Sequence, residues 1–242
     1  MLKNYVKLIL INYLNKKYMT IVPYNTHASQ VERVKYKWLI DKNINTIIDI
    51  GASTGGFVHK IRPFFPDAMI YSFEPIPDSY NYLVKRFSKD KRFMAYNLAL
   101  GDVTGQMDFY INKHIGASSI LEMTDLHKTA HPHTANYSKT IINIDKLDNV
   151  FSREDLKEKI LLKLDVQGYE LKSLKGAQKL LKNIYAIYTE VSFCKLYEGQ
   201  ALFNDIIEFL AKMGFKLVGI EDISQSTIDG RFLQGNAFFI KM

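Results

Sequence analysis

The chain has 242 residues, of which 47% are hydrophobic and 24% are charged, with a formal net charge of +7 and a single cysteine. This length and composition exclude an intrinsically disordered chain and fit one folded domain with a short extension. One cysteine excludes an intramolecular disulfide and a cysteine-based metal site, in agreement with a reducing, cytoplasmic location.

The positive charge is concentrated near the N-terminus. Residues 1–48 hold eight basic and two acidic side chains, which is a net charge of +6. An enzyme acting on nucleic acid usually carries its basic surface around the active site, so we expect no nucleic-acid partner. Apolar residues at helical spacing over 2–14, with lysines between them, predict an amphipathic helix, and they are too few for a membrane span. This helix either packs against protein or lies on an anionic membrane surface, which leaves peripheral membrane association open.

Strands and helices alternate from residue 44, so we divide the chain into an N-terminal helical extension (1–43) and one domain (44–242). The expected strands cover 46–50, 69–73, 93–100, 160–166, 184–191, 215–220 and 236–240, and the main helices cover 55–64, 78–88, 169–181 and 202–213. The last two strands have no helix between them and suggest an antiparallel hairpin. The pattern predicts an α/β fold with a mostly parallel seven-stranded sheet, helices on both faces and an antiparallel edge strand.

The middle of the chain departs from this alternation. Residues 106–111 and 140–144 look like further strands, and residues 153–159 look like a short helix. Residues 112–137 are polar, hold four of the six histidines and show no helical period. Long segments of this kind in a compact domain are often functional, so we expect a loop over the active site.

A glycine-rich turn with the sequence DIGASTGG occupies residues 49–56, between a predicted strand and a predicted helix. Small residues there let the backbone approach a ligand, and the start of the helix offers free N–H groups. Enzymes that bind nucleotides or dinucleotides also use such turns. The carboxylate of Asp49 would repel a pyrophosphate, but it suits a ligand that carries an ammonium and a sulfonium group.

A second acidic residue, Glu74, ends the second predicted strand 23 residues after Gly51. A carboxylate at this place can accept hydrogen bonds from both ribose hydroxyls of an adenosine. Together, Asp49 and Glu74 favour S-adenosylmethionine over NAD as the cofactor. The end of the third strand, at 98–100, is where the adenine ring could lie.

Several segments of the chain resemble the FkbM-type methyltransferase family. They are IIDIGASTGGF (47–57), YSFEPIPDSYNYL (71–83), NLALGD (97–102), GASSI (116–120), LLKLDVQGYELKSLKGA (161–177) and IYTEVSF (187–193). The resemblance covers about residues 44–242 and implies a Rossmann-like class I methyltransferase. Such enzymes act mainly on hydroxyl oxygens, including those of sugars in glycans or glycolipids and those of polyketides.

The resemblance also implies roles for single residues. Those expected to contact the methionine part of the cofactor are Asp49, Gly51, Ser53 and Gly55, while Glu74 binds the ribose and Leu98 and Ala99 border the adenine. The family commonly has Asn where Ser53 stands and Glu where Gln167 stands. We therefore expect an O-methyltransferase for a sugar hydroxyl of a surface glycan or its lipid-linked precursor. A methyltransferase for another acceptor (a natural product, RNA or protein) and an inactive cofactor-binding relative remain alternatives.

A sugar hydroxyl is a poor nucleophile, so a general base or a metal ion is expected to assist. Asp165 is the first candidate base because it follows a central strand, although it could instead cap the next helix. Glu190, which ends the following strand, is the second, and the two carboxylates together could hold Mg²⁺. His131 is the third, within the spacing His127, His131, His133, which is not diagnostic of zinc and is also typical of a solvated loop.

Overall fold

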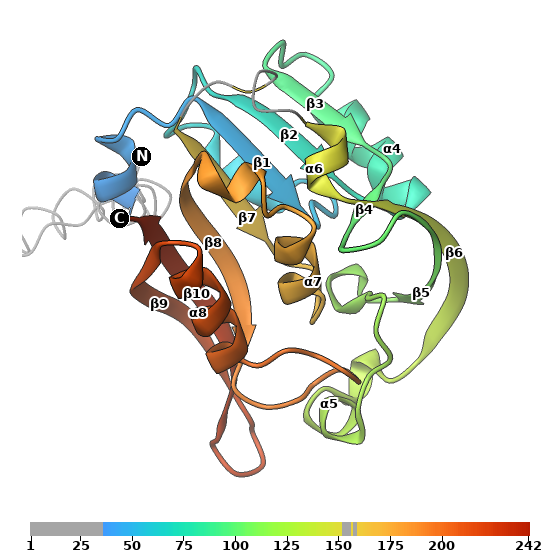
Figure 1. The fold of residues 1–242 in the computed structure, drawn as a ribbon. Coiled ribbons are helices and arrows are strands. Elements are labelled where there is room, and N and C mark those ends of the chain that lie inside the picture. Colours follow the sequence, from blue (N-terminus) through green and yellow to red (C-terminus); the bar gives the residue numbers. More distant parts are fainter. Residues whose placement is uncertain (1–35, 152–155, 157–158) are drawn as a thin grey trace, which may run out of the picture. The chain divides into compact units, whose positions relative to one another are not determined.

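The computed structural model describes residues 36–151, 156 and 159–242, and residues 43–242 form one unit that is distinct from residues 1–42 (Figure 1). The predicted amphipathic helix over 2–14 and most of the predicted helix over 153–159 lie outside the described residues. Among the residues that are described, no helix is both long and apolar enough to cross a bilayer.

The main sheet has seven strands in the order β3-β2-β1-β7-β8-β10-β9. These strands are β1 (Thr46–Ile50), β2 (Met69–Phe73), β3 (Phe93–Tyr96), β7 (Ile160–Leu164), β8 (Ile184–Ser192), β9 (Phe215–Gln225) and β10 (Phe232–Lys241). Pairing is parallel from β3 to β8 and antiparallel on both sides of β10. The predicted mostly parallel sheet and its antiparallel hairpin are therefore confirmed.

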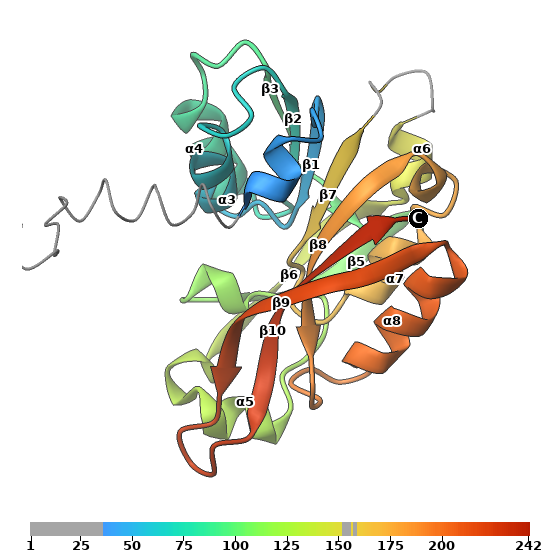
Figure 2. The same cartoon turned by 90° about the vertical axis from the view of Figure 1, so that its left-hand side faces the viewer.

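Helices cover both faces of this sheet, as Figure 2 shows. One face carries α3 (Gly56–Ile61) and α4 (Pro77–Arg86), and the other carries α6 (Leu147–Val150), α7 (Glu170–Lys175) and α8 (Phe203–Lys212). The C-terminal end of α8 is followed by Gly214 at φ 81°, a left-handed conformation that ends helices and favours glycine.

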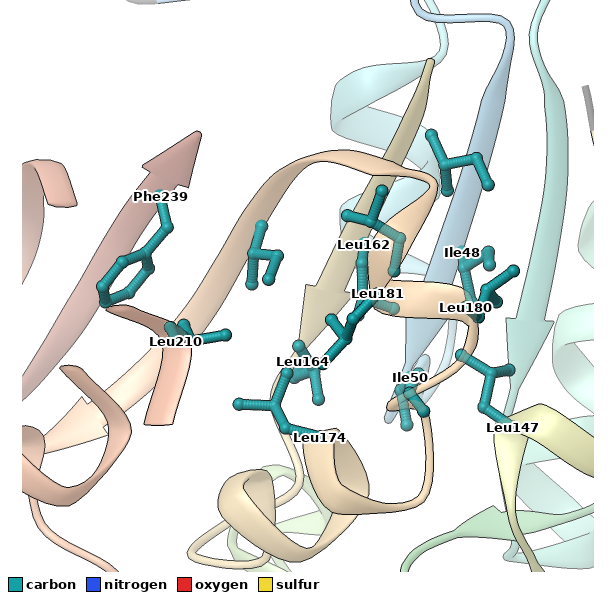
Figure 3. Packing of buried hydrophobic residues seen from close by; sticks show 14 of the residues in the cluster. Ile48, Ile50, Leu147, Leu162, Leu164, Leu174, Leu180, Leu181, Leu210 and Phe239 are labelled. Carbon is teal, nitrogen blue, oxygen red and sulfur yellow. The ribbon is translucent and has the colours of Figure 1, made fainter. Parts of the chain in front are cut away.

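The main hydrophobic core lies between the sheet and the helices α7 and α8 (Figure 3). Its fully buried members include Ile48, Ile50, Leu162, Leu164, Leu174, Leu210 and Phe239. Each such side chain contributes roughly 1.5–3 kcal/mol through removal from water. Because side chains alternate along a strand, Asp49 and Lys163 point to the opposite face of the sheet, where Phe57 of α3 lies 5.7 Å from the Lys163 ammonium.

A second, three-stranded sheet is inserted between β3 and β7. It has the order β4-β6-β5 and consists of β4 (Ala99–Leu100), β5 (Gly105–Asn112) and β6 (Tyr137–Asp145). The prediction of one strand over 93–100 is wrong in this respect, because β3 ends at Tyr96 and β4 pairs with β6. The Asn97 amide donates to the carbonyls of Glu74 and Pro75 at 2.9 Å, which turns the chain away from the main sheet.

The predicted loop over 112–137 contains short helices. These are η1 (Ile115–Ala117), α5 (Asp125–Ala130) and η2 (Pro132–Thr134). The Thr124 hydroxyl caps α5 by accepting a hydrogen bond from the His127 backbone N–H. A helix of six residues spans fewer than two turns, so it leaves no periodic signal in the sequence.

The predicted helix over 169–181 is also divided. α7 ends at Lys175, and a separate short helix, η4 (Leu180–Lys182), follows. At the break, a Cβ atom on Gly176 would lie 1.8 Å from the Gly101 carbonyl oxygen. Only glycine allows these two backbones to come so close, and this contact fixes α7 beside the turn that follows β4.

Candidate active site

The candidate site lies where the strand order reverses, between β1 and β7. In open α/β sheets, ligands bind in the crevice beyond the carboxyl ends of the strands at such a point. A pocket of roughly 620 Å³, partly open to solvent, occupies this place. Its lining includes Gly51, Ser53, Glu74, Leu98, Asp165 and Gln167.

The glycine-rich turn forms one wall of the pocket. Gly51 has φ 76°, and a Cβ atom there would lie 1.9 Å from the Asp165 carbonyl oxygen, so this position requires glycine. Ser53 also lies in the left-handed region, at φ 50°, and lines the pocket. Gly55 does not line the pocket. A Cβ atom on Gly55 would meet Phe87 and Leu83 of the α4 region at 2.4 and 2.7 Å, so this glycine lets α3 and α4 pack together.

The Glu74 carboxylate is held rigidly at the end of β2. Its Oε2 accepts a hydrogen bond from the Ser53 backbone N–H at 2.7 Å, and its Oε1 accepts one from Ile76 N–H at 2.9 Å. Burial raises the pKa of Glu74, and the two backbone donors counteract this effect. Each oxygen keeps a second lone pair for a ligand, so the carboxylate fits two adjacent ribose hydroxyls.

Asp49 lies beneath the pocket rather than in its lining. Its side chain is fully buried, and its Oδ1 lies 3.0 Å from Lys163 Nζ. The same ammonium donates to the Gly51 carbonyl oxygen at 2.8 Å, so it ties β7 to the glycine turn. Burial alone would lower the pKa of Lys163, but the carboxylates of Asp49 and Asp165 outweigh burial and hold the pKa above its ordinary value.

An apolar compartment continues the pocket beyond Glu74. Leu98 and Ala99 line it, as predicted for the neighbours of an adenine ring, together with Ile76 and Phe109. The Glu74 carboxylate and this apolar surface therefore fit the adenosine half of the cofactor.

The loop after β7 connects the predicted catalytic carboxylates. The Gln167 Nε2 atom donates to Asp165 Oδ1 and to Glu190 Oε2, each at 2.9 Å. The Gln167 Oε1 atom accepts a hydrogen bond from the Tyr197 hydroxyl at 2.8 Å. The Asp165 side chain is 45% exposed and faces the pocket, and its Oδ2 lies 3.8 Å from Lys163 Nζ.

Glu190 is more enclosed than Asp165. Its two oxygens accept from Gln167 and from Gln234 Nε2, the latter at 2.7 Å, and it is not in the pocket lining. Burial, reinforced by the nearby carboxylates of Asp165 and Glu170, raises the pKa of Glu190 well above its ordinary value. Asp165 and Glu190 thus lie together, but only Asp165 reaches the pocket.

His131 lies in a cluster with the other histidines of the segment, away from the pocket lining. Its ring centroid is 5.4 Å from that of His127 and 6.1 Å from that of His133. His127 is buried, and its Nε2 lies 3.1 Å from the Thr134 hydroxyl, while burial lowers its pKa to about 4. Tyr197 lies between the cluster and the site. Its ring centroid is 4.9 Å from that of His127, and its hydroxyl donates to Gln167.

Two residues to which the sequence assigned no role belong to the site. Lys163 interrupts the apolar strand ILLKL, which is buried on both faces. A buried charge requires a partner, so the sequence alone could have indicated that Lys163 pairs with an acidic residue. Tyr197 lies in an irregular segment, and no sequence pattern marks its contact with Gln167.

The described residues contain no group of three acidic, histidine or cysteine side chains arranged to hold a metal ion. The pair suggested for Mg²⁺, Asp165 and Glu190, has the Gln167 amide nitrogen between its oxygens. An amide nitrogen is a donor and offers no lone pair to a cation. The residues present therefore do not fit a magnesium ion at this point.

The sheet order, the glycine turn and the acid after β2 define a Rossmann-like class I methyltransferase that uses S-adenosylmethionine. A comparison with family models supports this assignment, because the model of the methyltransferase FkbM domain matches residues 49–217. The chain belongs to the FkbM methyltransferase family.

Two similar proteins are informative. The chain is 26% identical over 186 residues to the 2-O-methyltransferase NoeI of Sinorhizobium fredii (strain NBRC 101917 / NGR234), covering 74% of this chain and 76% of that protein. The crystal structure of the methyltransferase FkbM from Methylobacillus flagellatus KT matches 81% of this chain with a TM-score of 0.51 and 14% identity. The chain spans 44% of the length of that second protein, and this likeness shows the fold alone.

Proposed function

We propose that this enzyme transfers the methyl group of S-adenosylmethionine to a hydroxyl oxygen of a carbohydrate, within a glycan or a glycolipid precursor. The observation that carries the proposal is the Asp165 carboxylate, which faces the pocket at the end of β7 beside the glycine turn. A hydroxyl acceptor needs a base at this place, since it must lose its proton as it attacks. The relative from Sinorhizobium fredii, whose name gives it as a 2-O-methyltransferase, is consistent with oxygen as the acceptor atom.

The chemistry is a single in-line displacement. The cofactor supplies an activated methyl group on a sulfonium. The acceptor oxygen forms a bond to the methyl carbon as the carbon–sulfur bond breaks, and the bonding electrons stay on sulfur. The hydroxyl proton passes to Asp165, so the products are the methyl ether, S-adenosylhomocysteine and a protonated carboxyl. The main task of the protein is to hold the oxygen about 3 Å from the methyl carbon in line with sulfur.

Asp165 suits the role of base better than the other two candidates. Glu190 is buried and has both oxygens engaged by glutamine amides, which leaves it poorly placed to receive a proton from a ligand. His131 is not in the pocket lining, and its pKa is lowered by burial and by His133. We assign Asp165 as the general base and Glu190 as a residue that shapes the network around it.

In this assignment, the cofactor residues are those of the pocket. Glu74 binds the ribose, Leu98 and Ala99 border the adenine, and the backbone of Gly51 and Ser53 faces the methionine part. Asp49 acts through Lys163, which holds the Gly51 carbonyl. The segment with Gly116, Ser118 and Ile120 lines the other side of the pocket and is our candidate for the acceptor side.

The experiment uses S-adenosylmethionine labelled in its methyl group. The enzyme is incubated with cell extracts divided into lipid-linked glycans, free oligosaccharides, RNA and protein, and the label is followed in each fraction. We expect label in a carbohydrate fraction, as a methyl ether that survives mild base. Label confined to RNA or protein would refute a carbohydrate acceptor, and label in no fraction despite cofactor binding would support an inactive relative.

A further inference from the structure

The side chain of Gln167 is fully engaged by three other side chains. Both of its amide hydrogens point at carboxylates, at 2.9 Å from Asp165 Oδ1 and 2.9 Å from Glu190 Oε2. Its carbonyl oxygen accepts from the Tyr197 hydroxyl at 2.8 Å. In this network the amide nitrogen faces the two acids, and the amide oxygen faces the hydroxyl that donates to it.

The backbone of Gln167 is held as firmly as its side chain. Its φ is 53°, in the left-handed region that residues other than glycine rarely adopt. Its carbonyl oxygen accepts a hydrogen bond from the Ser119 hydroxyl at 2.7 Å, so the segment before α5 also contacts it. Strained conformations of this kind persist where the surroundings determine them, and they cluster at functional sites.

Two carboxylates that approach one common point need something between them. A shared proton, a cation or a donor with two hydrogens can each relieve their repulsion. In this protein the donor is the Gln167 amide, and the Lys163 ammonium adds a positive charge on the far side of Asp165, 3.8 Å from its Oδ2. The Gln167 amide thus orients Asp165 through its Oδ1, while Oδ2 lies on the side of Lys163.

We propose that Gln167 is a positioning residue that stands in place of a divalent cation between Asp165 and Glu190, so that methyl transfer by this enzyme needs no bound metal. The inference rests on the proposed role of Asp165. The proposal predicts that replacing the Gln167 amide by a carboxylate, which exchanges its nitrogen for an oxygen, creates a metal site. Mg²⁺ and Mn²⁺ prefer carboxylate oxygens, and Gln167→Glu would bring three carboxylates together.

The first experiment measures metal binding and needs no acceptor. The thermal midpoint of the full chain is recorded with chelator and with millimolar Mn²⁺, for the wild type and for Gln167→Glu. We expect no Mn²⁺-dependent shift in the wild type and a rise of about 5 °C or more in the variant. Gln106→Glu is the matched control, because the exposed Gln106 side chain of β5 donates to Asn143 of β6, outside the pocket lining, and this variant should respond as the wild type does.

Further readouts keep the proposal testable if Gln167→Glu folds poorly. Gln167→Met keeps the length of the side chain but removes both donors. It should lower kcat about 10- to 100-fold, shift the pH profile of kcat and change the affinity for S-adenosylmethionine by less than about 3-fold. Tyr197→Phe, which frees the amide to rotate, should show a smaller loss of the same kind.

Specific results would overturn the proposal. They are a chelator-sensitive wild type restored by Mg²⁺, a folded Gln167→Glu protein with no Mn²⁺ response, and a Gln167→Met enzyme with an unchanged kcat and pH profile. The metal measurements are independent of the acceptor. A wrong carbohydrate assignment would therefore leave the Mn²⁺ results intact, and a wrong role for Gln167 would leave the labelling results intact.

Discussion

Replacing Lys163 by methionine tests the buried ion pair that supports the glycine turn. Methionine keeps the length and the apolar stem of the side chain but removes the ammonium group. In the wild type, this ammonium lies 3.0 Å from Asp49 Oδ1 and donates to the Gly51 carbonyl oxygen at 2.8 Å. The variant therefore leaves a fully buried carboxylate without its cation.

The expected loss of stability is large. Removal of one partner from a buried pair costs about 3–5 kcal/mol. In a domain of this size, that loss lowers Tm by roughly 6–20 °C. Asp49→Asn should cost less, because Lys163 keeps the Gly51 carbonyl and the Asp165 carboxylate as partners. The double variant has no unpaired buried charge, so it should recover most of the loss seen in Lys163→Met.

Urea unfolding at neutral pH, followed by circular dichroism, compares the wild type, both single variants and the double variant. The dependence of the unfolding free energy on urea should be the same in all four proteins, since the surface exposed on unfolding hardly changes. The reasoning is refuted if Lys163→Met is within about 1 kcal/mol of the wild type. It is also refuted if the double variant loses the full sum of the two single losses, because the two side chains would then be energetically independent.

Three further predictions concern the cofactor, the base and the histidine cluster. Glu74→Gln should weaken binding of S-adenosylmethionine about 10- to 100-fold in calorimetry, because a charge-assisted hydrogen bond contributes about 1.5–3 kcal/mol; an unchanged Kd would remove Glu74 from the ribose site. Asp165→Asn should leave this Kd within about 3-fold but lower kcat about 10²- to 10⁴-fold, and an unaltered rate would exclude Asp165 as the base. Because burial holds the pKa of His127 at about 4, its neutral form stabilises the native state above about pH 6.5, and this contribution is lost as the pH falls toward 4. His127→Gln should therefore show a weaker fall of the urea midpoint between about pH 7 and pH 4 than the wild type, and equal falls would contradict the assignment.

The main sheet could be predicted from the sequence because its central strands are short apolar runs that end at a glycine or an acidic residue. β1 and β7 are buried on both faces, so their hydrophobic runs have few other interpretations. The run over 93–100 is equally apolar, yet it divides between two sheets. That division depends on the bonds of Asn97 to carbonyls more than 20 residues away, which no local pattern encodes.

The sequence could predict those residues of the candidate site that lie at the ends of strands. Parallel strands bring their carboxyl ends to one edge, so Glu74 and Asp165 were expected near each other without knowledge of any contact. The pairing of Asp49 with Lys163 was not expected, and it moves Asp49 from the pocket to the layer beneath it. The bond from Tyr197 to Gln167 joins irregular segments, and only the folded chain shows it.

The contact between Gly51 and Asp165 has a mechanical consequence. Because these backbones touch, and because the Asp165 N–H donates to the Ile50 carbonyl at 3.1 Å, the turn that we propose for the donor and the residue that we propose as the base belong to one rigid block. A shift of the turn therefore carries the Asp165 backbone with it, and the separation of the two is preserved. A misplacement of about 1 Å can cost about 100-fold in rate. The contact between the two backbones therefore preserves the alignment on which the proposed reaction depends.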